Sequence, residues 1–329
     1  MSLRTLFLPA DRTGIRRAAE VIRAGGLVAF PTETVYGLGA DALSDRAVAR
    51  IFEAKGRPRG NPLIVHLASA GALESVAAHV PSPARDVAAR FWPGPLTLVL
   101  PRAGTVPLIT TGGLETVAVR VPSHAVARAL IEAGGRPIAA PSANRSGRPS
   151  PTRAEHARED LEGRIELILD GGPTPIGVES TVLDMTTQPP TLLRPGGVTL
   201  EALRACLGAV DVLGSDDDEA AGRSPGLRYR HYAPRAQVIL IEAGTGERAV
   251  TPWLAAGRPV ALMAQRRVSL ERPGFRVKTM PDDLGAYARD LFAVLRELDS
   301  TGVEGIFVEG VTEQGLGHTI MDRLRRAAS

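Results

Sequence analysis

The feature that most constrains the fold of this chain is an alternation of short apolar runs with helical stretches over residues 1–205. In chain order these segments read LVAF, DRAVARIFEA, PLIVHL, ARDVAARF, LTLVL, VAVRVP, HAVARALIEAG and PIAAP. Strands and helices that interleave in this way form a sheet covered by helices. The sequence therefore predicts an α/β fold.

A change of composition near residue 210 divides the chain. Residues 214–224 read GSDDDEAAGRS, a small and acidic stretch that is typical of an exposed linker. Beyond it, the apolar runs QVILIEA, RPVALMA and EGIFVEG are accompanied by the amphipathic stretches DDLGAYARDLFAVLRELDS and HTIMDRLRRAAS. We expect a catalytic α/β domain over 1–205, a linker over 206–236 and a smaller Rossmann-like α/β domain over 237–329.

Several classes of protein are disfavoured. The longest apolar runs, such as LTLVL and VILI, are far too short to span a membrane, and MSLRTLFLPADR lacks the apolar segment of a signal peptide. The one cysteine, Cys206, excludes an internal disulfide, and no Cys/His spacing resembles a zinc site. The sequence predicts a reduced, cytoplasmic protein with no membrane partner and no metal ligand supplied by the chain.

The charge is distributed unevenly. Residues 1–205 hold 23 basic and 19 acidic residues, whereas residues 237–329 hold 12 of each. The positive excess of the first part would favour an anionic ligand there. Aromatic residues make up only 4% of the chain, so few rings are present for base stacking.

The glycine patterns do not indicate a common nucleotide fold. The chain has no G-x-x-x-x-G-K-[ST] motif, which excludes a P-loop. Residues 37–42 (GLGADA) fit G-x-G-x-x-A, but PTETVY separates them from the preceding apolar run, whereas a dinucleotide fingerprint follows its strand directly. GLGHTI at 315–320 lies too near the end for a following strand that carries an acidic residue.

Six polar clusters rich in Gly or Pro, each beside an apolar run, are the candidates for a site. They are FPTETVYGLG (30–39), KGRPRGNPLIVH (55–66), RVPSH (120–124), APSANRSGRPSPT (140–152), GVESTVLD (177–184) and LLRPGG (192–197). Loops at strand ends line the ligand crevice of open α/β sheets. We therefore expect these clusters to line such a crevice.

Lys55 is an unusual choice of residue, because lysine occurs only at positions 55 and 278 while the other 37 cations are arginine. Together with Arg57 and Arg59 it could grip a polyphosphate. Lysine offers a compact point charge where arginine prefers planar bidentate contacts, so a crowded phosphate chain would favour the lysine. A solvated charged turn is the alternative that remains open.

The cluster at 140–152 has more hydroxyls than a turn needs. Ser142, Asn144, Ser146 and Ser150 could donate to phosphate or carboxylate oxygens. Alternatively, this is a capped loop in which Ser150 or Thr152 caps a helix through EHARED. Spacing alone leaves both interpretations open.

Taken together, the clusters closely resemble the YrdC-type L-threonylcarbamoyladenylate synthases. PTETVYGLGADA, KGRPRGNPLIVH, FWPGPLTLVL, VAVRVPSH, APSANRSGRPSPT, GVESTVLD and LLRPGG occur in the order of that family, and SPGLRYRHYAP with the trailing α/β unit is similar to its longer, two-domain branch. The resemblance implies a twisted open α/β sheet with a positively charged groove. It also implies conversion of L-threonine, bicarbonate (or CO2) and ATP, with Mg2+ held through the ATP phosphates, to threonylcarbamoyl-AMP and pyrophosphate.

The resemblance also assigns residues to two sides of the site. The threonine side would comprise Thr34, His66, Arg120, Ala140 and Ser180. The ATP side would comprise Lys55, Arg57, Asn61, Thr116, Ser142, Ser150, Arg194 and Tyr232. Lys55 and Arg57 would be catalytic by stabilising charge in the transfer, and Arg120 would pair with the amino-acid carboxylate. His66 is expected to bind substrate, not to act as a base.

Two other functions use the same domain type or a basic groove. Hydrogenase-maturation carbamoyltransferases use the same domain type, but they carry an acylphosphatase unit and zinc-finger cysteines that this sequence lacks. A non-catalytic RNA-binding module that uses the basic groove stays open, and it predicts salt-sensitive RNA affinity without ATP turnover. Beyond its substrates, the expected partner is the machinery that transfers the threonylcarbamoyl group to tRNA, and RNA contact by this chain is left open.

The segment SPGLRYRHYAP at 224–234 carries a further hypothesis. Pro225, Gly226 and Pro234 disfavour a regular helix or a central strand. We expect the segment to fold over the nucleotide as a lid, with Tyr232 reaching the ATP phosphates and water excluded from a hydrolysable product. The alternative is that it packs the two domains together.

Overall fold

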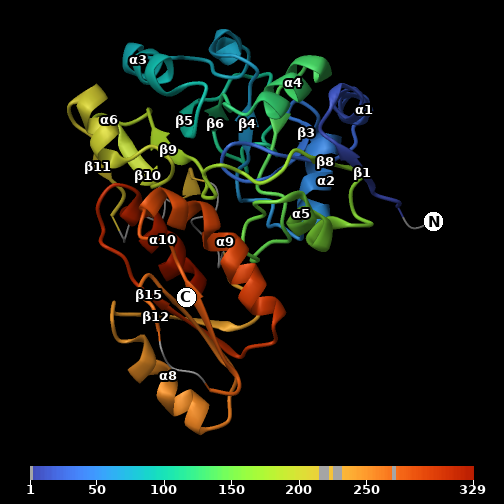
Figure 1. Ribbon diagram of the computed structural model, residues 1–329. Helices are drawn as coiled ribbons and strands as arrows, with labels where there is room; N and C mark the ends of the chain where they lie inside the picture. Colours follow the sequence, from blue (N-terminus) through green and yellow to red (C-terminus); the bar gives the residue numbers. More distant parts are fainter. Residues whose placement is uncertain (1–2, 215–221, 225–231, 269–271) are drawn as a thin grey trace. The chain divides into compact units, whose positions relative to one another are not determined.

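The computed structural model describes residues 3–214, 222–224, 232–268 and 272–329. The chain divides into two compact units, each described by itself (Figure 1). Unit 1 comprises Met1–Ser146, Pro151–Pro175 and Glu179–Arg228, and unit 2 comprises Gly147–Ser150, Ile176–Val178 and Tyr229–Ser329. Residues 225–231 of the expected lid and most of the acidic stretch lie outside the described residues.

The described part of unit 1 is built on one mixed sheet of eleven strands. In chain order the strands are β1 (Leu6–Pro9), β2 (Val28–Phe30), β3 (Gly37–Asp41), β4 (Ile64–His66), β5 (Leu96–Pro101), β6 (Thr116–Arg120), β7 (Ile138–Ala139), β8 (Leu167–Asp170), β9 (Thr181–Asp184), β10 (Thr191–Arg194) and β11 (Asp211–Val212). Their order across the sheet is β1-β8-β2-β3-β7-β4-β6-β5-β9-β10-β11. Most of GLGADA forms strand β3, so this glycine pattern is no phosphate-binding loop.

Helices pack on both faces of this sheet. They are α1 (Arg12–Arg23), α2 (Asp45–Lys55), the 3-10 helix η1 (Ala70–Ser75), α3 (Ser82–Phe91), α4 (Ala125–Gly134), α5 (Ala154–Leu161) and α6 (Leu200–Leu207). In β2, Val28 and Phe30 join the hydrophobic cluster formed with α1 and α4, whereas Ala29 joins the cluster formed with α2, α3, α5 and α6. Successive side chains of a strand point to opposite faces, which is why a strand covered on both faces is a continuous apolar run.

Local capping places Lys55 at the end of its helix. Helix α2 begins after Ser44, whose hydroxyl accepts the Ala47 N–H at 3.3 Å. It ends at Lys55 because Gly56 adopts the left-handed conformation with φ of 63°. The last side chain of α2 is therefore delivered at the start of the polar loop that leads into β4.

The described part of unit 2 is built on four parallel strands. They are β12 (Gln237–Ile241), β13 (Val260–Ala264), β14 (Phe275–Thr279) and β15 (Gly305–Glu309), in the order β12-β15-β13-β14. Their helices are α8 (Gly246–Ala255), α9 (Leu284–Ser300) and α10 (Leu316–Ala328). This arrangement confirms the predicted smaller α/β fold, since parallel strands need crossover connections.

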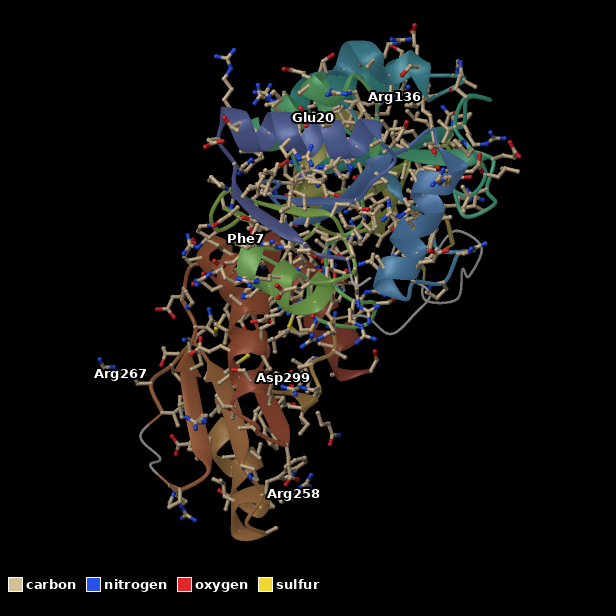
Figure 2. The ribbon with its side chains drawn as sticks, turned by 90° about the vertical axis from the view of Figure 1, so that its right-hand side faces the viewer. Phe7, Glu20, Arg136, Arg258, Arg267 and Asp299 are labelled. Atoms are coloured by element: carbon tan, nitrogen blue, oxygen red, sulfur yellow. The ribbon has the colours of Figure 1, made fainter. Side chains whose placement is uncertain are left out.

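Buried polar contacts hold the start of β12 to α9 within unit 2. The Asp299 carboxylate, labelled in Figure 2, accepts the Ala236 N–H at 2.9 Å and the Arg235 Nε–H at 3.1 Å. Elsewhere in this unit, the Arg258 guanidinium lies 3.5 Å from the centroid of the Trp253 ring. No helix in the described ranges is both long and apolar enough to cross a bilayer.

Candidate functional site

Two predicted site residues lie side by side at the carboxyl ends of β4 and β6. His66 and Arg120 are register partners in this parallel pair. His66 is buried, contacts the Phe30 ring edge-on, and has Nδ1 at 3.1 Å from the Ile64 carbonyl oxygen. Ala140 lies nearby, because its N–H donates to the same Ile64 carbonyl at 2.9 Å. Burial, assisted by the positive charge of Arg120, lowers the pKa of the His66 imidazole to about 3.

The Arg120 guanidinium is held on three sides although it is only 3% exposed. Nε donates to the Gly94 carbonyl at 3.1 Å and Nη1 donates to the Thr34 hydroxyl at 2.9 Å. Thr34 is itself hydrogen-bonded to the Thr32 hydroxyl at 2.8 Å. Nη2 lies 2.6 Å from the Glu33 carboxylate as an ion pair. The planar fork is thus fixed in one orientation, as recognition of a carboxylate requires.

Ser180 connects the two predicted sides of the site. Its hydroxyl is hydrogen-bonded to the Thr97 hydroxyl at 2.8 Å. Arg194, at the end of β10, donates from Nη2 to the Ser180 carbonyl at 2.9 Å and to its hydroxyl at 3.3 Å. A residue assigned to the ATP side therefore directly contacts one assigned to the threonine side.

Lys55 is buried against the hydroxyl-rich loop. Its Nζ donates to the carbonyl oxygens of Ser142 and Asn144, each at 2.5 Å, and its own carbonyl accepts the Ser146 N–H at 2.9 Å. The Ser142 hydroxyl donates to the Asn144 side-chain oxygen at 2.5 Å. Lys55 is only 3% exposed, so the interpretation as a solvated charged turn is wrong for this residue.

The neighbouring loop brings a second buried cation to the same region. Arg57 donates from Nε to the Asn61 carbonyl at 3.3 Å and from Nη2 to the Pro62 carbonyl at 2.9 Å. Asn61 is also buried.

Thr116 is the first residue of β6 and lies about 13 Å along the strand from Arg120. Thr116 is therefore separated from the group around Arg120.

Ser150 and Tyr232 belong to unit 2 and are described with it. Ser150 is fully buried, and the preceding Pro149 carbonyl accepts a hydrogen bond from Arg296 of α9 at 2.6 Å. Tyr232 is 5% exposed, has a φ of 65° and stacks on the Phe292 ring with 5.2 Å between centroids. This side chain thus packs against the core of unit 2.

The capping interpretation of the hydroxyl-rich loop is wrong. Helix α5 begins at Ala154 with Arg153 as its N-cap and with no capping side-chain hydrogen bond. Neither Ser150 nor Thr152 therefore caps this helix. Ligand binding by the hydroxyls of this loop stays a prediction.

The motifs led to cations and hydroxyls but missed an anion. Glu33 lies between Thr32 and Thr34 and is 4% exposed. Burial alone would raise the pKa of its carboxyl, but the Arg120 guanidinium and nearby backbone N–H groups hold that pKa below the usual range. An acid inside PTETVYGLG was the available sign, since a charged residue next to a buried strand needs a partner. In the described ranges, no three His, Cys, Asp or Glu side chains are grouped so as to hold a metal ion.

Comparison with known proteins places these features in a family. Residues 20–196 match a family model described as "Telomere recombination", and residues 198–329 match "Threonylcarbamoyl-AMP synthase, C-terminal domain". The chain is 52% identical over 324 residues to the threonylcarbamoyl-AMP synthase of Pyrococcus abyssi, covering 95% of this chain and 94% of that protein. It is 46% identical over 321 residues to the threonylcarbamoyl-AMP synthase of Bacillus subtilis, covering 95% of this chain and 92% of that protein.

Solved structures agree with the sequence comparison. The crystal structure of P. abyssi Sua5 complexed with L-threonine matches with a TM-score of 0.92 at 49% identity, over 100% of this chain and 98% of that chain. The structure of Escherichia coli YciO matches with a TM-score of 0.52 at 26% identity, over 59% of this chain and 96% of that chain. The match to P. abyssi Sua5 includes both units, whereas YciO matches only part of the chain.

Proposed function

The chain belongs to the Sua5/YrdC family of threonylcarbamoyl-AMP synthases, and we propose that its catalytic centre lies around Arg120, Lys55 and Ser180 of unit 1. There L-threonine, bicarbonate and ATP would react to give threonylcarbamoyl-AMP and pyrophosphate for threonylcarbamoyladenosine modification of tRNA. The observation that carries this assignment is the buried and fixed Arg120 fork. The threonine complex of P. abyssi Sua5 supports it through the shared fold.

On the threonine side, Arg120 would bind the substrate carboxylate through a bidentate pair. Thr34 and Ser180 would supply hydroxyls, and Ala140 would give apolar contact with the substrate methyl group. His66 has a pKa of about 3, so it would act as a neutral hydrogen-bonding group and not as a general base near pH 7.

On the ATP side, eight residues would receive the triphosphate. Four of them are buried and carry a cation or an amide, namely Lys55, Arg57, Arg194 and Asn61. Lys55 and Arg57 would stabilise charge as the carbamate oxygen attacks the α-phosphorus and pyrophosphate leaves. The remaining proposed ATP ligands are Asn61, Thr116, Ser142, Ser150, Arg194 and Tyr232. Lys55 already fixes the loop that carries Ser142, so its ammonium would both shape the ATP side and contribute charge to it.

These residues do not fit a magnesium ion held by the protein. The side chains proposed for the phosphates are cationic or neutral, and the described residues group no three His, Cys, Asp or Glu side chains. Mg2+ prefers carboxylate and phosphate oxygens. We therefore treat Mg2+ as part of the MgATP substrate, where it would neutralise part of the charge of the triphosphate.

The direct test is pyrophosphate release by the full chain with each of the twenty amino acids, with and without bicarbonate. We expect release to require threonine, bicarbonate and MgATP together. Serine lacks the methyl group and should have a kcat/KM about 10–200-fold lower. Release that is independent of the amino acid would overturn the assignment.

The site itself is tested by an arginine pair. Arg120→Lys keeps the charge but loses the fork, so we expect the KM for threonine to rise about tenfold or more. Arg136→Lys is the matched control, because Arg136 pairs with Asp41 at 3.1 Å but is half-exposed. An unchanged threonine KM in Arg120→Lys would place the amino acid elsewhere.

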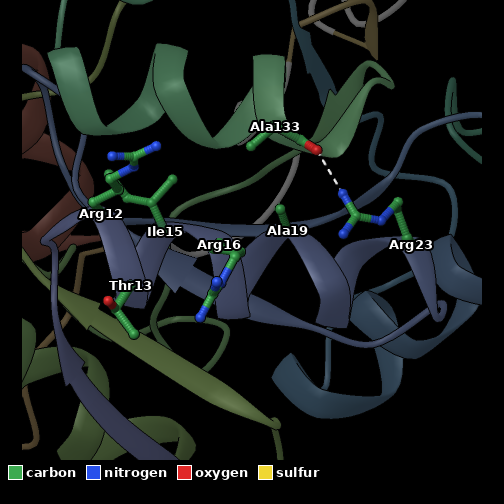
Figure 3. A pocket seen from close by; sticks show the side chains of 7 residues that line it. All are labelled: Arg12, Thr13, Ile15, Arg16, Ala19, Arg23 and Ala133. Atoms are coloured by element: carbon green, nitrogen blue, oxygen red, sulfur yellow. Dashed lines mark hydrogen bonds between the residues drawn. The ribbon is translucent and has the colours of Figure 1, made fainter.

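We also propose that RNA is contacted at the cavity between α1 and α4. Arg12, Arg16 and Arg23 are four and seven residues apart, which puts them within about 40° of one another around the helix. With Ala133 of α4 they line a cavity of about 400 Å3 (Figure 3), and Arg23 Nη1 donates to the Ala133 carbonyl at 2.5 Å. Arginine side chains in such a row suit the phosphates of a nucleic-acid strand.

The RNA proposal is tested by salt dependence. Binding of unmodified tRNA should weaken with salt, and Arg16→Gln should reduce the log–log slope by about one. Arg85→Gln is the control, because Arg85 is an exposed arginine of α3 paired with Glu74 at 2.7 Å. Identical slopes for the two variants would rule out this surface, while pyrophosphate release should be normal in both.

A further inference from the structure

Glu33 is a buried carboxylate with unused hydrogen-bonding capacity. It is 4% exposed and its Oε1 lies 2.6 Å from Arg120 Nη2. The ion pair is close in distance but does not have the geometry of a hydrogen bond. Backbone N–H groups, that of Ser123 among them, lie near enough to lower the pKa of the carboxyl, yet neither buried carboxylate oxygen has a partner in full hydrogen-bond geometry. A carboxylate can accept about four hydrogen bonds, and a buried polar group left unsatisfied costs about 1–3 kcal/mol. Such a group is expected where a ligand supplies the missing donors.

The titratable groups around Glu33 leave it as the anion of this pocket. The Arg120 guanidinium, at the end of β6, lowers the pKa of the Glu33 carboxyl. The Glu33 carboxylate in turn acts to raise the pKa of His66, at the end of β4, and of His124, in the segment before α4. Burial lowers the pKa of both imidazoles, to about 3 for His66, so the His66 ring is a weak proton acceptor near neutral pH. His124 Nδ1 also accepts the Val126 N–H at 3.2 Å as a helix cap.

The charges of this pocket match those of a free amino acid. An amino acid brings one carboxylate and one ammonium group. Arg120 offers the fork that a carboxylate requires, and Glu33 at its side offers acceptors for an ammonium group. Opposite charges placed in this way hold a zwitterion in one orientation and discriminate against the reversed one.

We propose that Glu33 is a catalytic residue that binds the α-ammonium group of the amino-acid substrate and takes one proton from it. This inference rests on the proposed function, because it requires the amino acid to be seated on Arg120. It gives the reaction a general base, which His66 with its pKa of about 3 does not supply. It also explains why an acid lies between the two threonines of this loop.

The step balances with bicarbonate as the carbon source. Glu33 removes one proton from the ammonium group and leaves a neutral amine. The amine nitrogen forms a bond to the bicarbonate carbon, and the bond from that carbon to its hydroxyl oxygen breaks. The hydroxyl leaves as water with a second proton from the nitrogen. The products are the carbamate anion, water and protonated Glu33, which returns its proton to solvent when the product leaves.

Substrate binding changes the balance of effects on Glu33. In the free protein, burial favours the protonated carboxyl, but Arg120 and the nearby backbone N–H groups together outweigh it, so the pKa of Glu33 is lowered. A substrate carboxylate on Arg120 would offset that positive charge, while burial would remain. The affinity of Glu33 for a proton then rises only when an amino acid is seated. Proton transfer is thereby coupled to binding.

The test is the pH dependence of Glu33→Gln. General-base catalysis contributes about 10²–10⁴-fold, so we expect kcat at pH 7 to fall about 100-fold with the fold intact by circular dichroism. Deprotonation by solvent rises tenfold per pH unit below the pKa of the amine. The deficit of Glu33→Gln relative to wild type should therefore shrink markedly between pH 7 and 9. Glu74→Gln, an exposed acid of η1, should follow the wild-type profile.

The opposite result is a deficit that stays constant across this pH range, which would make Glu33 a positioning residue and overturn the proposal. If Glu33→Gln does not fold, Glu33→Asp decides, because it keeps the carboxylate and should keep a wild-type-shaped profile at a reduced rate. A deficit of Glu33→Asp relative to wild type that shrinks markedly between pH 7 and 9 would also overturn it. If Arg120→Lys raises the KM for threonine but Glu33→Gln does not, the Glu33 proposal is wrong while the proposed function stands. If neither variant raises the KM for threonine, the amino acid does not bind at this site and the proposed function is wrong as well.

Discussion

The two sheets of this chain bury acidic side chains at the ends of their strands, but they satisfy them differently. In unit 1, Glu33 lies 2.6 Å from Arg120 as an ion pair, but its carboxylate oxygens have no partner in full hydrogen-bond geometry. In unit 2, the buried Glu309 at the end of β15 accepts the Gly246 N–H at 2.9 Å, and Arg266 lies 3.4 Å away. Because buried polar groups are normally satisfied, the contrast separates a pocket prepared for a ligand from a structural contact.

The hydrogen bond of Glu309 also explains a glycine pattern in unit 2. Residues 244–249 read G-x-G-x-x-A directly after β12 and at the start of α8, where a dinucleotide fingerprint belongs. Yet the N–H of Gly246 is already taken by the Glu309 carboxylate, at the helix start where a phosphate would bind. The pattern here joins a helix to its own sheet.

Tyr232 gives the largest expected effect. Its ring stacks on Phe292, and the Arg323 guanidinium lies 5.4 Å from its centroid. Tyr232→Ala should lower the free energy of unfolding by about 3–5 kcal/mol, measured by urea denaturation. Tyr232→Phe keeps the stacking, so a raised ATP KM in that variant would isolate a role of the hydroxyl at the phosphates. Unchanged stability in Tyr232→Ala would contradict the packing described for unit 2.

Substitution of Lys55 is expected to affect activity. Loss of a buried charged contact costs about 1.5–3 kcal/mol, so pyrophosphate release should fall about tenfold or more in Lys55→Ala. Lys55→Arg should also be impaired, because a broad guanidinium does not replace an ammonium that donates to both Ser142 and Asn144. Lys278→Ala is the control, since the other lysine pairs with Glu297 on the surface. Normal rates in Lys55→Arg would refute the special role of this ammonium.

Glu309→Gln sharpens the comparison from the side of unit 2. It weakens a charge-assisted hydrogen bond to Gly246 and the contact with Arg266, so the free energy of unfolding should fall by about 1–3 kcal/mol. The KM values of the folded variant should match those of the wild type. Glu33→Gln should instead change the KM for threonine and leave the free energy of unfolding nearly unchanged. A threonine KM that changes in Glu309→Gln would erase the distinction between the two acids.

His66 gives a smaller, pH-dependent effect. The folded ring stays neutral down to about pH 3, whereas the unfolded ring takes up a proton below about pH 6.5. Its contribution to stability is therefore present above pH 6.5 and is lost as the pH falls, by at most about 1.4 kcal/mol per pH unit. In urea titrations from pH 7 to 5, His66→Gln should lose stability less steeply than wild type. Equal slopes would mean that the ring is not buried as a neutral group.

The sequence predicted which loops carry polar groups but not which groups meet. Apolar runs followed by Gly, Pro and hydroxyls correctly placed Arg120 and His66 at strand ends, because periodicity and turn chemistry are local. The partners of Lys55 are backbone carbonyls 87 and 89 residues away, and Glu33 meets Arg120 across 87 residues. Such pairings follow from strand order, which no local pattern encodes. The local pattern therefore missed Glu33.

In unit 2, the sequence did not predict which segments belong to the domain. The segments Gly147–Ser150 and Ile176–Val178 belong to this unit although at least fifty residues separate each from its main part. Arg296 of α9 donates to Pro149, and Gly177, with φ of 80°, lies against the backbone of α9. A glycine is needed there because a Cβ would come 2.3 Å from Arg289 Cα. A domain boundary drawn along the sequence cannot show such an exchange.

The most direct test of the contrast between the two units is hydrogen exchange of the full chain, with and without L-threonine, bicarbonate and a non-hydrolysable ATP analogue. We predict that the ligands slow exchange in the unit 1 segments 31–38 and 120–128, which flank Glu33 and Arg120. The unit 2 segments 242–250 and 309–312, around Glu309, should exchange as in the free protein. Protection confined to the segments around Glu309, with none around Glu33 and Arg120, would contradict the account.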